Sequence, residues 1–177
     1  MTTALWLLLA VALLGALDTL WYHEWRGRLP GRQGAQRELR LHAGRDFAYG
    51  LLFLALGWGR PAGALVWVLL AVVLLEVVIT LVDFVEEDRN RPLAAGERVL
   101  HTAIAIVYGS FLASLLPLAW AWAGLPAAYH VDPLGPWSWL FSALSLGVFG
   151  SGVRDLLAAR RLDLRAAPAH EPGVDRS

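Results

Sequence analysis

The chain alternates between long apolar segments and short segments rich in arginine, glycine and proline. Four apolar segments are long enough for a helix at about 1.5 Å per residue to cross a hydrocarbon core roughly 30 Å thick. They cover residues 4–22, 63–85, 99–123 and 137–158. Proline and glycine interrupt the chain between the segments, at 29–32, 59–63, 91–92 and 124–136. The pattern therefore predicts membrane-spanning helices joined by short loops.

A further span is less obvious, because the apolar run from Phe47 to Trp58 would reach only about 18 Å as a helix. We expect this helix to begin earlier and to carry His42 and Asp46 into the membrane. The chain then folds as an all-α integral membrane bundle of five transmembrane helices, in a single domain of residues 1–165. Residues 166–177 carry two prolines and mixed charge, which predicts a disordered cytoplasmic tail.

Composition supports a membrane protein and excludes some chemistry. Apolar residues make up 57% of the chain, with nine tryptophans, and the mean hydropathy is +0.51. The chain contains no cysteine, which removes disulfides, thiolate ligands and cysteine nucleophiles. Fifteen basic residues offset fifteen acids, so the net charge gives no indication of a nucleic-acid partner. We expect the lipid bilayer to be the main partner.

The arginines are distributed unevenly among the loops. They gather between the first and second spans, between the third and fourth, and after the fifth, whereas the two other loops share only Arg60. By the positive-inside rule, the N-terminus lies outside and the C-terminus in the cytoplasm, in the cytoplasmic membrane of a bacterium. The first span follows no basic segment, so we expect it to be retained rather than cleaved as a signal peptide.

An internal repeat appears when the sequence is shifted by 59 residues. The shift aligns polar and aromatic positions: Glu24 with Asp83, Glu38 with Glu97, His42 with His101, Tyr49 with Tyr108 and Gly50 with Gly109. Both units enter the membrane from the same side, which predicts parallel repeats over about residues 4–59 and 63–123. The two helix pairs would form a pseudo-symmetric four-helix bundle, to which the fifth span is added.

Helical spacing predicts where the repeated side chains point. At about 100° per residue, Glu38, His42 and Tyr49 share one helix face, and the second copy behaves in the same way. Charged groups at membrane depth are costly unless they face the bundle interior and find partners. We therefore expect six side chains to converge near the cytoplasmic side as metal ligands: Glu24, Glu38, His42, Asp83, Glu97 and His101.

This ligand set resembles that of the ferritin-like di-iron and di-manganese carboxylate bundles in ligand types, helix number and pseudo-symmetry. The spacing differs, because each repeat here has Glu-x3-His rather than Glu-x2-His. The resemblance implies two divalent transition-metal ions, with iron preferred and manganese or zinc as alternatives. A single Glu-x3-His pair is more often a solvated or capping pair, so the repetition carries the argument.

Several other residues are candidates for chemistry. Tyr49 and Tyr108 could carry protons or a radical, although core aromatics are the simpler interpretation. Glu76 is the deepest acid and either relays protons or bonds to Thr80 as a protonated carboxyl group. We expect Asp18 to pair with Arg154 on the fifth span. Further candidate ligands flank the main set: His23, Asp46, Glu86, Glu87 and Asp88.

Three functions remain open. The preferred one is a metal-dependent oxidoreductase that acts on a lipid-soluble substrate, with an electron donor as a further partner. The second is a haem b electron carrier with His42 and His101 as axial ligands, but the adjacent glutamates would add uncompensated charge beside the porphyrin. The third is a metal-ion carrier or sensor, which the scarcity of polar groups in the outer half disfavours.

Overall fold

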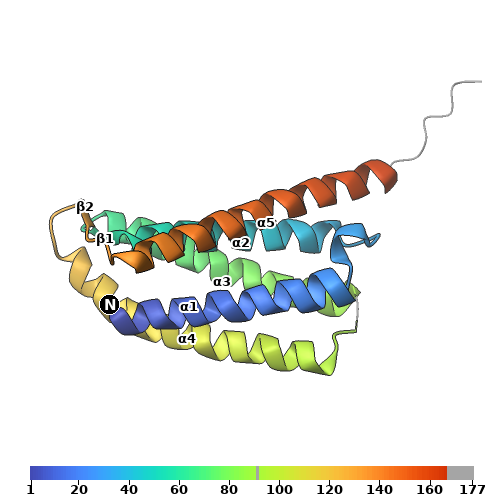
Figure 1. The fold of residues 1–177 in the computed structure, drawn as a ribbon, viewed down its shortest axis with the longest axis horizontal. Coiled ribbons are helices and arrows are strands. Elements are labelled where there is room, and N and C mark those ends of the chain that lie inside the picture. The colour runs from blue at the N-terminus through green and yellow to red at the C-terminus, as the bar shows by residue number, and fades with distance from the viewer. Residues whose placement is uncertain (91, 167–177) are drawn as a thin grey trace, which may run out of the picture.

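The computed structural model describes residues 1–90 and 92–166, and long helices that run side by side dominate this part of the chain (Figure 1). The long helices are α1 (Thr2–Asp18), α2 (Gln36–Gly57), α3 (Leu65–Asn90), α4 (Ala95–Ala123) and α5 (Pro136–Ala166). α1 continues into a wider helical segment, η1 (Thr19–Arg26), and a single tight turn, η2 (Leu29–Gly31), follows. The predicted all-α class is confirmed.

Within residues 1–90 and 92–166, four helical segments are long and apolar enough to cross a membrane: Thr2–Arg26, Leu65–Asn90, Ala95–Ala123 and Pro136–Ala166. α2 has 22 residues, which corresponds to about 33 Å, but charged residues interrupt its first turns. It begins at Gln36 and includes His42 and Asp46, as the sequence predicts. That α2 is a fifth span remains a prediction.

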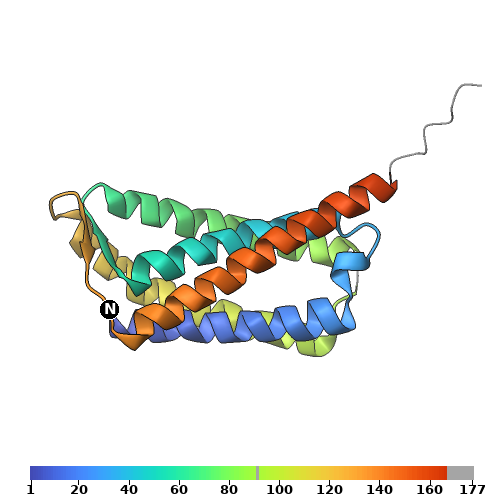
Figure 2. The ribbon, with the colours of Figure 1, turned by 45° about the horizontal axis from the view of Figure 1, so that its top comes forward.

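The helices pack in two pairs, with α5 outside them. α1 lies along α4, and α2 lies between α3 and α5 (Figures 1 and 2). Exchanging α1 with α3 and α2 with α4 would superpose the α1–α4 pair on the α2–α3 pair. A parallel repeat requires this arrangement. The repeat itself stays a prediction. α5 breaks this relation because it packs on α2.

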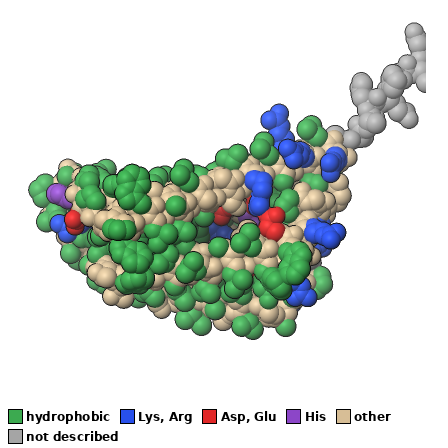
Figure 3. Space-filling model, in the orientation of Figure 1, with side chains coloured by type: hydrophobic (Ala, Val, Ile, Leu, Met, Phe, Trp, Pro, Cys, Tyr) green, Lys and Arg blue, Asp and Glu red, His purple; other side chains and the backbone are tan. Residues whose placement is uncertain are grey.

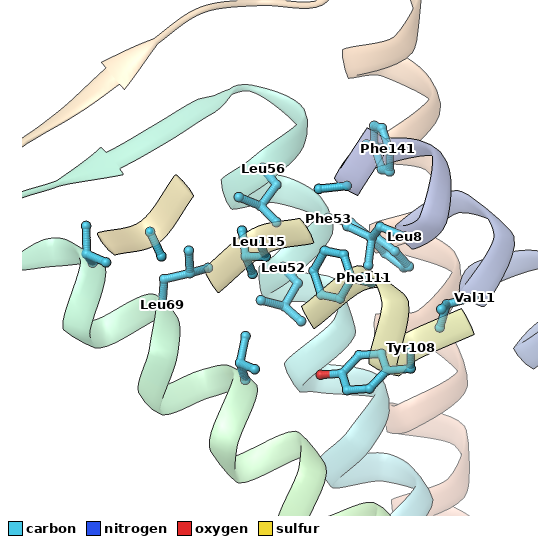
Figure 4. Packing of buried hydrophobic residues seen from close by; sticks show 14 of the residues in the cluster. Leu8, Val11, Leu52, Phe53, Leu56, Leu69, Tyr108, Phe111, Leu115 and Phe141 are labelled. Atoms are coloured by element: carbon cyan, nitrogen blue, oxygen red, sulfur yellow. The ribbon is translucent and has the colours of Figure 1, made fainter. Parts of the chain in front are cut away.

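One half of the bundle is filled by apolar side chains (Figure 4). Phe53, Phe111 and Leu115 are almost completely buried there, and they come from α2 and α4. On the outside, large apolar side chains such as Trp67 and Trp120 are exposed. A bundle surrounded by lipid needs no polar outer face, so this distribution fits a membrane environment.

α5 approaches α2 closely at two glycines. A Cβ at Gly50 would lie 2.6 Å from the ring of Phe149, and one at Gly57 would lie 2.6 Å from Phe141. The hydroxyl of Ser145 donates a hydrogen bond of 2.9 Å to the carbonyl oxygen of Gly50. Small residues at a helix interface allow such contact, and hydrogen bonds between helices strengthen it.

The loops at the end of the bundle near the N-terminus carry an element that the sequence analysis did not predict. Gly59–Ala62 (β1) and Ala128–Val131 (β2) pair as antiparallel strands and join the two loops. Arginine side chains gather at the opposite end of the visible face (Figure 3). α5 extends to Ala166, beyond the predicted end at residue 158, and the tail predicted to be disordered lies from residue 167 onward outside the described residues.

Candidate metal centre

The first helix widens where it approaches the arginine-rich end. In η1 the N–H groups bond to carbonyl oxygens five residues earlier, as the 2.8 Å bond from Gly27 to Tyr22 shows. In a regular α-helix, residues five apart point about 140° away from each other. The wider turn instead brings His23 onto the face of Asp18, with Nε2 of His23 3.5 Å from Oδ2 of Asp18. Such turns occur frequently at functional sites.

The pair formed by α1 and α4 contributes four possible ligands. Nε2 of His101 lies 3.0 Å from Oδ2 of Asp18. Glu97 is buried one helical turn before His101, and its Oε1 lies 3.7 Å from Nε2 of His23. Ligand atoms of Asp18, His23, Glu97 and His101 all lie within 4.8 Å of one another. This spacing is close enough for one ion to contact all four side chains.

The pair formed by α2 and α3 contributes a corresponding set. Nε2 of His42 lies 3.2 Å from Oδ2 of Asp83 and 4.0 Å from Oε1 of Glu87. Glu38 is buried one turn before His42 and interacts with it electrostatically. Nη1 of Arg45 is 3.2 Å from Oδ2 of Asp83. In each pair of helices, an aspartate of one helix therefore contacts the histidine of the Glu-x3-His motif on the other.

His23 and Glu87 connect the two sets into one cluster. The ring of His23 stacks on that of His42, with centroids 4.4 Å apart and planes inclined by 16°, and the two Nδ1 atoms are 3.3 Å apart. Oε2 of Glu87 lies 3.6 Å from Nδ1 of His101. His23, His42 and Glu87 form a second group whose ligand atoms lie within 4.8 Å of one another. The cluster thus combines three imidazoles with the carboxylates of Asp18, Glu38, Asp83, Glu87 and Glu97.

All eight side chains of the cluster are buried. Within the described residues, Oδ1 of Asp18 and Oδ1 of Asp83 are inaccessible to solvent and accept no hydrogen bond. Burying carboxylates costs several kcal/mol each unless cations or hydrogen bonds compensate the charge. Such a concentration of carboxylates requires positive charge or protons at the cluster.

Five of the six predicted ligands lie in this cluster, and the sixth pairs with another helix. Glu24 forms an ion pair with Arg154 of α5, and 30% of its side chain is exposed. The predicted pairing of Asp18 with Arg154 is wrong, because Asp18 contacts His101 and His23 instead. Asp18 was missed as a ligand because only the wide turn of η1 directs it and His23 to the same place.

Two of the residues predicted to carry protons, Tyr49 and Tyr108, pack with the apolar core. Tyr49 and Tyr108 meet edge to face with ring centroids 6.0 Å apart. Glu76 is 1% exposed, and the hydroxyl of Thr80 donates a 2.8 Å hydrogen bond to its Oε1, as predicted for the structural alternative.

The flanking candidates lie in different settings. Oε2 of Glu86 is 3.0 Å from Nη1 of Arg37, outside the cluster, and Asp88 is exposed. Asp46 lines a cavity of about 340 Å³ that lies between α1 and α5. The same cavity reaches Asp18 and His101 of the cluster. The cluster is therefore buried within the bundle but borders a space that opens sideways.

Comparisons with known proteins give no relative of this chain. No model of a known protein family matches the sequence, and no curated protein or solved structure matches it either. The function therefore has to be inferred from the chemistry of the cluster and of the cavity beside it.

Proposed function

We propose that the cluster binds two divalent transition-metal ions, with iron preferred, and that the protein is a membrane oxidoreductase acting on a lipid-soluble substrate at the cytoplasmic side. One observation carries this proposal: three imidazoles and five carboxylates from four helices are buried together. Imidazole and carboxylate are the ligands that iron, manganese and zinc accept in proteins. Two ions bound between four helices also agree with the carboxylate bundles that the ligand set resembles.

Charge supports two ions rather than one. If the five carboxylates are ionised, they contribute −5, and Arg45, which contacts Asp83, contributes +1, so the cluster carries −4 with neutral histidines. Two divalent ions contribute +4 and bring this sum to zero. Neutralising buried charge removes most of the free-energy cost of burying it. One divalent ion would leave two negative charges for protons to neutralise.

The third histidine favours a metal pair over the haem alternative. An axial histidine must bind the haem iron through a ring nitrogen, and the porphyrin needs open space on both sides of that nitrogen. The ring of His42 instead has His23 stacked against it and Asp83 within 3.2 Å of its Nε2. A carboxylate that holds a histidine in place is typical of the surroundings of a metal ligand.

We assign proton transfer to the polar residues beside the cluster. Tyr49 lines the cavity, and its ring contacts that of Tyr108. These two tyrosines would pass protons or an electron between the substrate and the metals. Glu76 would accept protons on the side away from the arginine-rich end.

Metal analysis tests this proposal directly. Purified protein should contain about two transition-metal ions per chain by inductively coupled plasma mass spectrometry. The variant His23→Ala should lower this number, because it removes the imidazole that connects the two halves of the cluster. His130→Ala is the matched control, since His130 lies in β2 at the other end of the molecule. A folded, active parent protein without metal would sink the proposal.

The orientation in the membrane follows from the same proposal and has its own test. The loops around β1 and β2 would face outward, and the cluster would face the cytoplasm. A cysteine introduced at Ala127 should react with a membrane-impermeant maleimide added to intact cells, and one at Ala94 should not. The reverse pattern would invert the assignment.

A further inference from the structure

The cavity between α1 and α5 has walls of small side chains. The facing positions lie at helical spacing on both helices: Ala12, Gly15 and Ala16 on α1, and Ala143, Gly147 and Ser151 on α5. Small residues usually allow two membrane helices to touch. Here they border a space of about 340 Å³ instead. Charged side chains are visible between the two helices from the side (Figure 3).

Aromatic rings and two residues of the cluster form the inner end of the cavity. Tyr49, Phe53 and Phe84 line it, and the ring of Phe84 stacks on that of His101 with centroids 5.3 Å apart. Asp18 also lines the cavity, and it is only 3% exposed. Flat aromatic surfaces favour a flat ligand, because rings pack well in stacked or edge-to-face geometry.

The charges around the cavity favour a neutral ligand. Two arginines and two aspartates line it, and both arginines already contact other acids. Arg45 contacts Asp83, and Arg154 contacts Glu24 and Asp155. No excess of positive charge is left to hold a carboxylate or phosphate, which would also be repelled by Asp18 and Asp46.

We propose that this cavity binds the ring of a lipid-soluble quinol, with the hydroxyl group directed toward Asp18. Oδ1 of Asp18 is buried and accepts no hydrogen bond within the described residues, so it requires a donor, which a quinol hydroxyl supplies. The volume admits one substituted six-membered ring, and the open side between α1 and α5 lets the alkyl chain remain in the lipid. This inference rests on the proposed function, because it names the substrate class of the same site.

Two glycines allow the cavity to be filled without disturbing the helices. A Cβ at Gly15 or at Gly147 would meet no other atom within 4 Å, so a leucine there extends into the cavity. Gly109 on α4 is equally open but does not line the cavity, and Gly109→Leu is therefore the matched control. The probe is a radiolabelled benzoquinol with a ten-carbon chain, kept reduced under argon, and binding is measured on protein in lipid nanodiscs.

The parent protein and Gly109→Leu should bind the quinol saturably, and Gly15→Leu and Gly147→Leu should weaken binding at least tenfold. Decanoic acid and decane should not compete. Equal competition by decanoic acid, or quinol binding that the leucines leave unchanged, would overturn the inference. Metal content separates the two proposals. A parent protein that holds two metals but does not bind the quinol contradicts only this inference, whereas cavity-dependent quinol binding by a metal-free parent protein contradicts only the metal proposal.

Discussion

The two helix pairs that hold the cluster make the same contact in different surroundings. His101 meets Asp18 at 3.0 Å between α4 and α1, and His42 meets Asp83 at 3.2 Å between α2 and α3. On the α2 side, Arg45 contacts the aspartate and α5 packs against the helix. On the α1 side, the aspartate borders the cavity. The aspartate of the α2 half is thus paired with an arginine, whereas the aspartate of the α1 half borders the cavity.

Similar side chains in the two halves therefore need not have similar roles. In the proposed metal centre, both halves would hold the ions through corresponding contacts, whereas access to the ions would depend on the helix behind each half. α5 has no counterpart in the two helix pairs and packs mainly on α2. The different surroundings of the two aspartates therefore come from Arg45 and from the added helix, and not from the residues that would bind metal.

The largest expected effect is a loss of bound metal, which tests whether the two halves of the cluster contribute equally to metal binding. His42→Ala and His101→Ala should each reduce the metal content from about two ions per chain to about one or fewer, because each histidine is buried against a carboxylate in its own half. Inductively coupled plasma mass spectrometry measures the loss. Retention of both ions in either variant would mean that the two halves do not share a metal pair.

A second test decides which acid on the first helix corresponds to Asp83. The 59-residue offset aligns Asp83 with Glu24, whereas the contacts in space relate it to Asp18. Asp18→Asn and Asp83→Asn should both lower metal occupancy, and Glu24→Gln should leave it unchanged, because Glu24 pairs with Arg154. If Glu24→Gln also loses metal, Glu24 is a ligand as the sequence alone predicts.

The third test concerns the charge that only the α2 half contains. Arg45→Met leaves Asp83, which is fully buried, without its arginine. Removing one partner of a buried ion pair costs about 3–5 kcal/mol. We expect a large fall in the melting temperature of metal-free protein, and a smaller one after metal is added, because divalent ions also neutralise Asp83.

Thermal unfolding in detergent, followed by light scattering, measures both values for Arg45→Met. Arg40→Met is the control, because its ion pair with Asp163 is exposed and such pairs contribute at most about 1 kcal/mol. Equal losses in the two variants would show that Arg45 does not compensate a buried charge.

The smallest effect comes from two glycines that the repeat aligns. Gly50→Ala would push a methyl group against the ring of Phe149 and should destabilise the protein by about 1–3 kcal/mol. Gly109→Ala meets nothing within 4 Å and should stabilise its helix by about 0.5–1 kcal/mol. The same unfolding assay gives both values. Similar destabilisation by both variants would mean that α5 does not distinguish the two repeats.

Much of this architecture could be predicted because it depends on local patterns. The apolar runs are long enough to predict helices, and the start of α2 before His42 followed from the length that a span requires. Regular α-helical spacing predicted that Glu38 and His42, like Glu97 and His101, share a face, and all four are buried in the cluster. These residues lie on helices with 3.6 residues per turn.

Only the tertiary structure decided the remaining features, because they depend on contacts between distant segments or on a departure from regular helix geometry. The wide turn of η1 rotates the end of the first helix, so that Asp18 and His23 enter the cluster and Glu24 meets Arg154 instead. No spacing rule for a regular helix contains that rotation. The position of α5 against α2 depends on close packing at Gly50 and Gly57, and it leaves the cavity beside α1 open. Periodicity shows which face of a helix is apolar or polar, but not which other helix covers it.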